Sequence, residues 1–358
     1  MSTVMRLLLV VLGSVGLLIY FRSIIRMMLL NRRERDFLQR GAARIVIAIV
    51  HGLARGKRTQ AQVKHAQAWL MPLFIFCIVL IWFLLVQISF SLILWGVNAE
   101  SSWVKAMVAS GSALSTLGFQ TPKTLTGELL AIGEAAIGLG IVILLFTFVP
   151  GYQAAVQVRE RKGGWLHSRT IGAESACLSL LESLQRSGRT HDASVWESWE
   201  DWFRGVLETH AISPILAYVP SIYRGNWVDT AATVLDAVSL VLVSADSKDS
   251  TEAARLCRAT GISALHTIAG ELVGDRPKQA GLGEVRSADT SAALGGLYDK
   301  LRAQGVPIAT DKERWVHDLS SLRADYVPSL RHISRATLMP VHEPWQSPLS
   351  DDEVHDRS

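Results

Sequence analysis

Residues 69–97 contain no charged side chain over 29 positions. A helix needs about 20 apolar residues to cross the hydrocarbon core of a bilayer, which is about 30 Å thick. This segment therefore predicts a membrane-spanning helix with some tilt. Trp69 and Trp95 lie near its ends, where aromatic side chains favour the membrane interface. Trp82 lies in the middle and is expected to pack against a neighbouring helix, so the sequence predicts a membrane protein.

Charged residues are distributed unevenly along the 358 residues. Residues 1–69 carry 12 Lys and Arg against 2 Asp and Glu, residues 70–150 carry 2 against 3, and residues 151–358 carry 22 against 27. The net charge of +4 thus reflects one basic segment beside a membrane span, which is typical of a cytoplasmic juxtamembrane region and not of a nucleic-acid-binding protein. We expect residues 22–64 to bind anionic lipids. Within them, residues 45–50 predict either an interfacial amphipathic helix or a cytosolic helix packed on a neighbour.

Two further apolar segments complete the predicted topology. Residues 7–21 follow a basic residue and end in bulky side chains, which favours an uncleaved anchor over a removed signal peptide. Residues 129–149 carry a single charge, Glu134. Because short basic segments stay in the cytoplasm, we expect a multi-pass protein of the cell membrane with its N-terminus outside and the chain after residue 150 in the cytoplasm.

A short polar stretch, residues 112–122, lies between the second and third spans and reads Ser-Ala-Leu-Ser-Thr-Leu-Gly-Phe-Gln-Thr-Pro. It is too polar to cross a bilayer and too short to be a soluble domain. Ser101 or Ser102 can cap a helix from Trp103 to about Leu114. The negative end of that helix dipole would favour a nearby cation. We expect this helix and the following loop to enter the membrane and return on the same side.

The loop resembles the pore loop of tetrameric potassium-channel-like proteins, whose filter reads Thr-Val-Gly-Tyr-Gly-Asp. Residues Thr116, Leu117, Gly118 and Phe119 match its first four positions, and the hydroxyl residue Ser115 precedes them. Residues 69–150 as a whole are similar to the outer helix, pore helix, filter and inner helix of that family. The resemblance implies a homotetramer in which four loops offer backbone carbonyls to dehydrated K⁺ or Na⁺. Gly118 is expected to adopt a positive φ, which glycine does without penalty.

Two positions depart from the family pattern. Gln120 stands where the family has its second glycine, and Thr121 stands where it has aspartate. A residue other than glycine costs about 1–2 kcal/mol in a left-handed conformation, so the outer layer of the filter is expected to be built differently. The sequence therefore predicts a cation filter formed by Thr116, Leu117, Gly118, Phe119 and Gln120, and it leaves the choice of ion open.

Ser115, Glu134, Gly138 and Gly140 are candidates for lining or gating the pore. Gly140 lies 22 residues after Gly118, about where the channel family carries its hinge glycine. The alternative is that Gly133 and Gly140 allow close helix packing. Carboxylates inside membranes face a cavity or a partner, so Glu134 is expected to support the filter, attract cations, or form a hydrogen bond with the pore helix.

The region after residue 150 is predicted to be helical. Helices are expected at about 171–187, 193–210, 228–244, 250–273, 289–304 and 310–326. Trp196, Trp199, Trp202 and Phe203 recur at helical spacing and predict a buried face. The region after about residue 190 is similar to the C-terminal part of uncharacterised bacterial proteins grouped with the channel family, which implies no mechanism.

The predicted fold is an all-α membrane protein with three transmembrane helices, a re-entrant pore loop and an α-helical cytosolic domain. Its segments are an N-terminal anchor (1–22), a basic linker (23–68), a pore domain (69–150), a helical cytosolic domain (151–339) and a disordered tail (340–358). The pore domain divides into an outer helix (69–97), pore helix (102–114), filter (115–121) and inner helix (128–150).

The expected function is a homotetrameric cation channel that its cytosolic domain gates or assembles. The alternatives are a non-conducting membrane scaffold or signalling protein and a membrane-anchored enzyme. The 3 cysteines and 10 histidines are dispersed and no catalytic motif is present, so we expect no enzyme and no cofactor or metal beyond permeant cations. Voltage sensing is not expected, and the sequence names no gating ligand.

Overall fold

The computed structural model describes residues 2–28, 36–55, 59–170, 173, 175–221, 225–245, 251–272, 288–306, 308 and 311–345. Over these residues the protein is all-helical, with 82% helix and no strands, which confirms the predicted helical class. It forms two compact units: unit 1 comprises residues 1–55 and 69–154, and unit 2 comprises residues 56–68 and 155–358. Within the described residues, five helices are long and apolar enough to cross a membrane.

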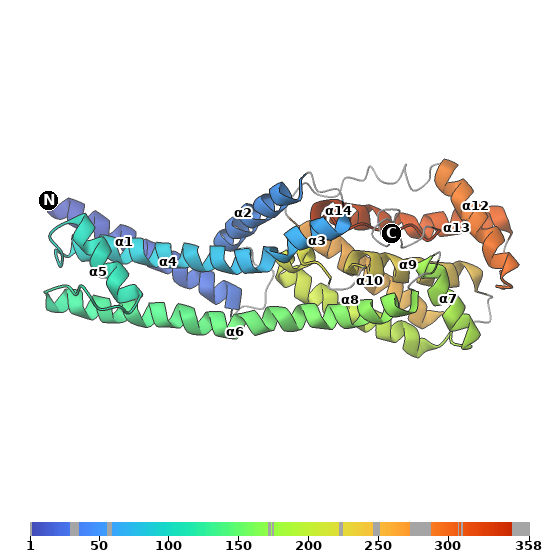
Figure 1. Cartoon of the computed structure of the whole chain (residues 1–358), viewed down its shortest axis with the longest axis horizontal. Coiled ribbons are helices and arrows are strands. Elements are labelled where there is room, and N and C mark those ends of the chain that lie inside the picture. Colours follow the sequence, from blue (N-terminus) through green and yellow to red (C-terminus); the bar gives the residue numbers. More distant parts are fainter. Residues whose placement is uncertain are drawn as a thin grey trace. The chain divides into compact units, whose positions relative to one another are not determined.

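Unit 1 contains α1 (Thr3–Met28), α2 (Phe37–Ala54), α4 (Leu70–Gly96), α5 (Trp103–Leu114) and the first part of α6 (Leu125–Thr170) (Figure 1). Small residues bring α1 close to α4. A Cβ atom added to Gly16 would lie 2.1 Å from Ser89 Oγ, and one added to Gly13 would lie 2.5 Å from the Ser89 carbonyl oxygen. Such close approach is how apolar helices associate in lipid, where no hydrophobic force drives them together.

A buried polar chain joins three helices of unit 1. Trp82 Nε1 donates a hydrogen bond to Ser23 Oγ of α1 over 3.0 Å. Ser23 Oγ donates to Asp36 Oδ2 over 2.6 Å, and Asp36 caps α2 by accepting from the amide of Gln39. The predicted packing of Trp82 against a neighbouring helix is confirmed. The apolar residues 45–50 belong to α2, which buries Val46 and Val50.

Helix α6 continues well beyond its predicted end at Pro150. It runs from Leu125 to Thr170 with Pro150 inside it, so the inner helix predicted for 128–150 is only its first part. A proline inside a helix removes one hydrogen bond and costs about 3 kcal/mol. Gly151 follows directly and is also unfavourable in a helix, but the good helix formers Ala154, Ala155 and Gln157 come within the next two turns. The remaining hydrogen bonds of a helix of 46 residues allow it to continue past this position.

Unit 2 is a bundle of helices around α9. Its elements are α3 (Gln60–Ala68), the end of α6, α7 (Ala176–Arg186), α8 (Ala193–Ile212), the 3₁₀ helix η1 (Pro214–Tyr218), α9 (Trp227–Ser244), α10 (Glu252–Glu271), α12 (Ala288–Ala303), α13 (Lys312–Ala324) and α14 (Val327–Thr337). The four predicted aromatic residues of α8 are buried, as expected. The separate helix α14 was not predicted.

Helix α9 lies at the centre of this unit because most of its residues are apolar. It contacts α7, α10, α13 and α14. By length and composition α9 also qualifies as a membrane span, but 83% of its apolar window is buried inside the protein. A mostly apolar helix is suited to either environment. Because the two acids of α9, Asp229 and Asp236, are buried within the protein, we assign α9 to the core of unit 2.

The segment after α14 packs against unit 2 as far as Trp345. Asn226 Nδ2 donates to the carbonyl of Pro340 over 2.7 Å, the amide of His342 donates to Asp229 Oδ1 over 2.8 Å, and Ser175 Oγ donates to the carbonyl of Pro344. Residues 340–345 of the predicted disordered tail thus form hydrogen bonds with the unit. The rest of that tail, residues 346–358, lies outside the described residues.

Candidate functional site: the helix and loop of residues 102–127

Helix α5 has the bounds that the sequence predicts. It begins after Ser102, whose hydroxyl accepts a hydrogen bond from the amide of Lys105 over 3.3 Å, and it ends at Leu114. Ala106 and Ala109 are buried against Leu94 of α4. These alanines let α5 lie close along the end of α4. The predicted capped helix from Trp103 to Leu114 is confirmed.

The end of α5 turns through a left-handed residue. The amide of Thr116 donates to the carbonyl of Ala113 over 2.9 Å, and the amide of Leu117 donates to the carbonyl of Ser112 over 3.0 Å. With Thr116 at φ 58°, this pattern is a Schellman motif, in which glycine is the usual residue. A β-branched residue in this conformation is an outlier and costs about 1–2 kcal/mol. Backbone strain therefore falls on the first predicted filter position.

The next left-handed residue is Gly118, at φ 68°, as predicted. Gln120 does not adopt a positive φ. Its amide donates to Ser112 Oγ over 3.0 Å, and its side-chain Nε2 donates to the carbonyl of Lys105 over 3.4 Å. Gln120 thus forms two hydrogen bonds that hold the loop against α5, at the position where the resemblance implies a second glycine.

Amides and carbonyls of the loop differ in their hydrogen bonding. The amides of Thr116, Leu117, Gly118 and Gln120 all donate to groups at the end of α5. No described residue donates a hydrogen bond to a carbonyl of residues 116–120. The side chains of Leu117 and Phe119 are 69% and 67% exposed. Within the described part of one chain, the loop therefore presents a run of acceptor oxygens without donors.

Close contacts of two glycines of α6 locate both ends of this segment and the end of α5. A Cβ atom on Gly127 would lie 2.4 Å from Pro122 Cβ and 3.0 Å from Ala99 Cβ, so entry and exit meet at the start of α6. A Cβ atom on Gly138 would lie 2.1 Å from the Leu114 carbonyl oxygen. At 1.5 Å per residue, Gly138 is about 16 Å further along α6 than Gly127. Helix α5 thus runs back along α6 and the loop returns to the same end of unit 1 (Figure 1).

An acid is buried where α4, α5 and α6 meet. Glu134 has no exposed surface. Its Oε1 lies 2.5 Å from Ser110 Oγ of α5, and Ser110 Oγ also lies 3.0 Å from the carbonyl oxygen of Gln87 on α4. Among the described residues, Glu134 Oε2 has no hydrogen-bond partner. Of the roles predicted for Glu134, a hydrogen bond with the helix of residues 103–114 is the one that these contacts support. Sequence reasoning did not identify Ser110 or Gln87, which are polar residues in otherwise apolar helices.

The other candidate pore residues lie around the same helix end. Ser115 is exposed, and its Oγ donates to the carbonyl of Gly111 over 2.6 Å. Gly138 is in close contact with Leu114, whereas a Cβ atom on Gly133 or Gly140 would meet no atom within 4 Å. The helix continues through all three glycines. Within one chain, close packing is therefore a property of Gly138 and not of Gly133 or Gly140.

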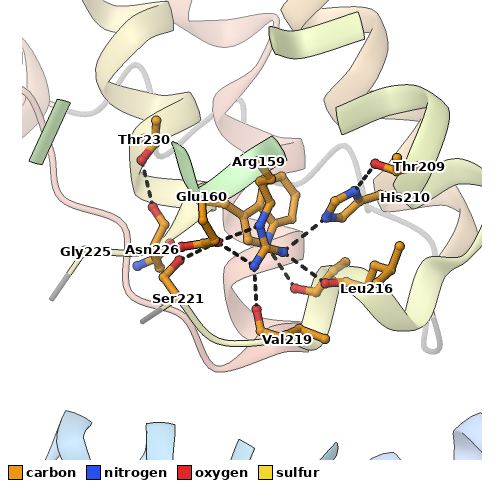
Figure 2. Close-up of polar contacts among 12 residues, drawn as sticks. Arg159, Glu160, Thr209, His210, Leu216, Val219, Ser221, Gly225, Asn226 and Thr230 are labelled. Atoms are coloured by element: carbon orange, nitrogen blue, oxygen red, sulfur yellow. Dashed lines mark hydrogen bonds and ion pairs between the residues drawn. The ribbon is translucent and has the colours of Figure 1, made fainter. Parts of the chain in front are cut away.

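Unit 2 contains a buried polar cluster centred on Arg159 of α6 (Figure 2). Arg159 is buried, and its guanidinium has five N–H groups. Two of them face Glu160 Oε1, at 2.8 Å from Nε and 2.6 Å from Nη2. Nη1 donates to the carbonyl of Leu216 and Nη2 to that of Val219, over 3.1 and 3.0 Å. The fifth group faces His210 Nε2 over 3.1 Å, so every donor has an acceptor.

These contacts fix the charge and tautomer of His210. Because the guanidinium only donates, His210 Nε2 must accept, and the ring proton lies on Nδ1, which is 2.8 Å from Thr209 Oγ1. Burial, together with the positive charge of Arg159, lowers the pKa of His210 well below 6.5. The histidine is thus a neutral acceptor for a buried cation.

We expect the stability of unit 2 to fall as the pH drops below 6.5. In that range the unfolded chain protonates His210 and the folded chain does not, because the pKa of His210 is lowered in the folded state. Each pH unit below 6.5 then costs about 1.4 kcal/mol. His210→Gln keeps a neutral acceptor and should show a smaller loss between pH 7.5 and 5.5 in denaturation experiments on the full chain in detergent. Equal losses for the two proteins would contradict this prediction.

The described residues contain no group of His, Cys, Asp or Glu side chains able to hold a metal ion. No protein-family model matches the chain, and no match was found to a curated protein or to a solved structure.

Proposed function

We propose that the chain is one subunit of a homotetrameric cation channel in the cell membrane. In this proposal α1, α4 and the first part of α6 cross the bilayer, and α5 with its loop re-enters it. The carbonyls of residues 116–119 form the filter for K⁺ or Na⁺. The N-terminus lies outside, and unit 2 lies in the cytoplasm, where it assembles or gates the pore.

The observation that carries the proposal is a loop whose carbonyl oxygens accept no hydrogen bond from the described residues and which follows a helix end far along α6 from its start. The end of α5 lies about 16 Å along α6 from the point where the loop enters and leaves, which is about half the thickness of the hydrocarbon core. Irregular backbone with unpaired polar groups does not face lipid, and at membrane depth it occurs only inside protein or beside a water-filled cavity. Four such loops around one axis would be enclosed by protein on one side and would line a water-filled pore on the other.

The surface of α6 is consistent with an assembly of several subunits. Ile132, Leu139 and Phe146 are exposed in the single chain, and the faces at Gly133 and Gly140 are open. Exposed apolar side chains are suited to lipid, and open glycines are suited to close contact with another helix. The first part of α6 therefore offers surface for lipid and for a neighbouring subunit.

Flux measurements test the proposed function. The purified protein in liposomes should carry a K⁺ or Na⁺ flux, and Gly118→Asp should abolish it because the side chain enters the filter at a left-handed position. Gly188→Asp is a matched control, since Gly188 also has a positive φ and open space around it but lies in unit 2. Absence of flux in the unsubstituted protein under any gradient would favour the non-conducting scaffold. A monomeric or dimeric mass in detergent would also contradict the proposal.

A further inference from the structure

The hydroxyl of Ser110 has two acceptors and only one proton. Its oxygen lies 2.5 Å from Glu134 Oε1 and 3.0 Å from the carbonyl oxygen of Gln87. If Glu134 were ionised, both neighbours would accept only, and one of the two oxygen contacts would contain no hydrogen. If Glu134 is protonated, its O–H donates to Ser110 Oγ and the Ser110 hydroxyl donates to Gln87. Only the second arrangement supplies a proton to each contact.

The second carboxyl oxygen leads to the same conclusion independently. Glu134 Oε2 is buried and has no hydrogen-bond partner among the described residues. An ionised carboxylate shares its charge between both oxygens, and a buried charge without donors is strongly unfavourable. A neutral acid places only a carbonyl oxygen there, at a much smaller cost.

Charged groups on the packed helices do not offset a charge on Glu134. Helix α4 carries no charged residue. The only charged residue of α5 is Lys105, which is exposed. On the first part of α6 the other acid is Glu128, which is also exposed. The surroundings of Glu134 are therefore neutral.

We infer that Glu134 is a protonated carboxylic acid that donates a hydrogen bond to Ser110 Oγ and so positions α5 on α6. The Ser110 hydroxyl in turn donates to the carbonyl of Gln87. The proton on Glu134 thus allows a continuous chain of hydrogen bonds from α6 through α5 to α4. Removing this proton at high pH leaves a carboxylate that competes with Gln87 for the single Ser110 proton. Glu134 is thus a positioning residue for the helix that carries the loop, and only its effect on conduction rests on the proposed function.

Infrared spectroscopy of the full-length protein in lipid at neutral pH tests this inference. Glu134→Gln should remove carbonyl-stretch absorption of a protonated carboxylic acid, whereas Glu128→Gln, at an exposed position of the same helix, should leave it unchanged. Ser110→Ala should shift this absorption to higher frequency, because the acid loses its acceptor. An unchanged acid band in Glu134→Gln would overturn the inference, and so would an unmoved band in Ser110→Ala if Glu134→Gln does not fold.

The outcome is separable from that of the flux experiment. A protein with the Glu134 acid band but without ion flux retains this inference and loses the proposed function. A protein that conducts ions but lacks the band retains the proposed function and loses this inference. If the unsubstituted protein conducts ions and its flux declines at high pH, the flux of Glu134→Gln should not decline, because the amide donates to Ser110 at every pH.

Discussion

Replacing Arg159 by methionine is expected to destabilise unit 2 by about 3–5 kcal/mol, which is the usual loss when one partner of a buried ion pair is removed. Methionine fills part of the volume but donates no hydrogen bond. Among the described residues, Glu160, which is also buried, would then retain only the hydrogen bond from Ser221 Oγ. The carbonyls of Leu216 and Val219 would lose their Arg159 donors as well (Figure 2).

Arg161→Met is the matched control, because it removes the same charge two positions away at an exposed site. Chemical denaturation of the full-length protein, followed by tryptophan fluorescence, provides the measurement, since Trp202 Nε1 donates to the carbonyl of Arg159. The double variant Arg159→Met/Glu160→Gln should regain part of the loss, because no buried charge is left unpaired. Similar losses for Arg159→Met and Arg161→Met would show that the buried cluster contributes little.

Gly138→Ala is expected to displace the end of α5 from α6. The added Cβ atom would lie 2.1 Å from the backbone carbonyl oxygen of Leu114 and 3.2 Å from its side chain. A carbonyl group in a helix cannot move aside as a flexible side chain can, so the helix itself must shift. Overpacking of this kind costs about 1–3 kcal/mol. If the proposed channel is correct, the ion flux should fall at least about fivefold, since every 1.4 kcal/mol corresponds to a factor of ten.

The control for this prediction lies on the same helix. Gly140→Ala introduces the same methyl group at a position with no atom within 4 Å, and it should change neither the melting temperature in detergent nor the flux. The melting temperature tests the packing even if the protein conducts no ions. Equal effects of Gly138→Ala and Gly140→Ala would mean that helix flexibility, and not the contact with Leu114, determines the result.

The sequence predicted the elements whose signals are local. The serines at 101 and 102 predicted the start of α5, where Ser102 is the cap. The spacing of Trp196, Trp199 and Trp202 predicted the buried face of α8. Both signals depend only on near neighbours in the sequence. The uncharged run of residues 69–97 gave α4 to within one residue at each end.

Features that depend on distant residues could not be predicted. Arg159 looks like one of several basic residues after a membrane span, and its burial depends on acceptors 51 to 60 positions further along the chain. The contact of Glu134 with Ser110 joins residues 24 positions apart. Pro150 suggested a helix end by the usual local rule, but the residues on both sides continue the helix.

The left-handed turn at Thr116 is less stable with threonine than it would be with glycine. Glycine would adopt this conformation without penalty, whereas threonine gives up about 1–2 kcal/mol. On the scale of 1.4 kcal/mol per factor of ten, a contact of the Thr116 side chain that offsets this penalty would have to favour the turn by about 5- to 30-fold.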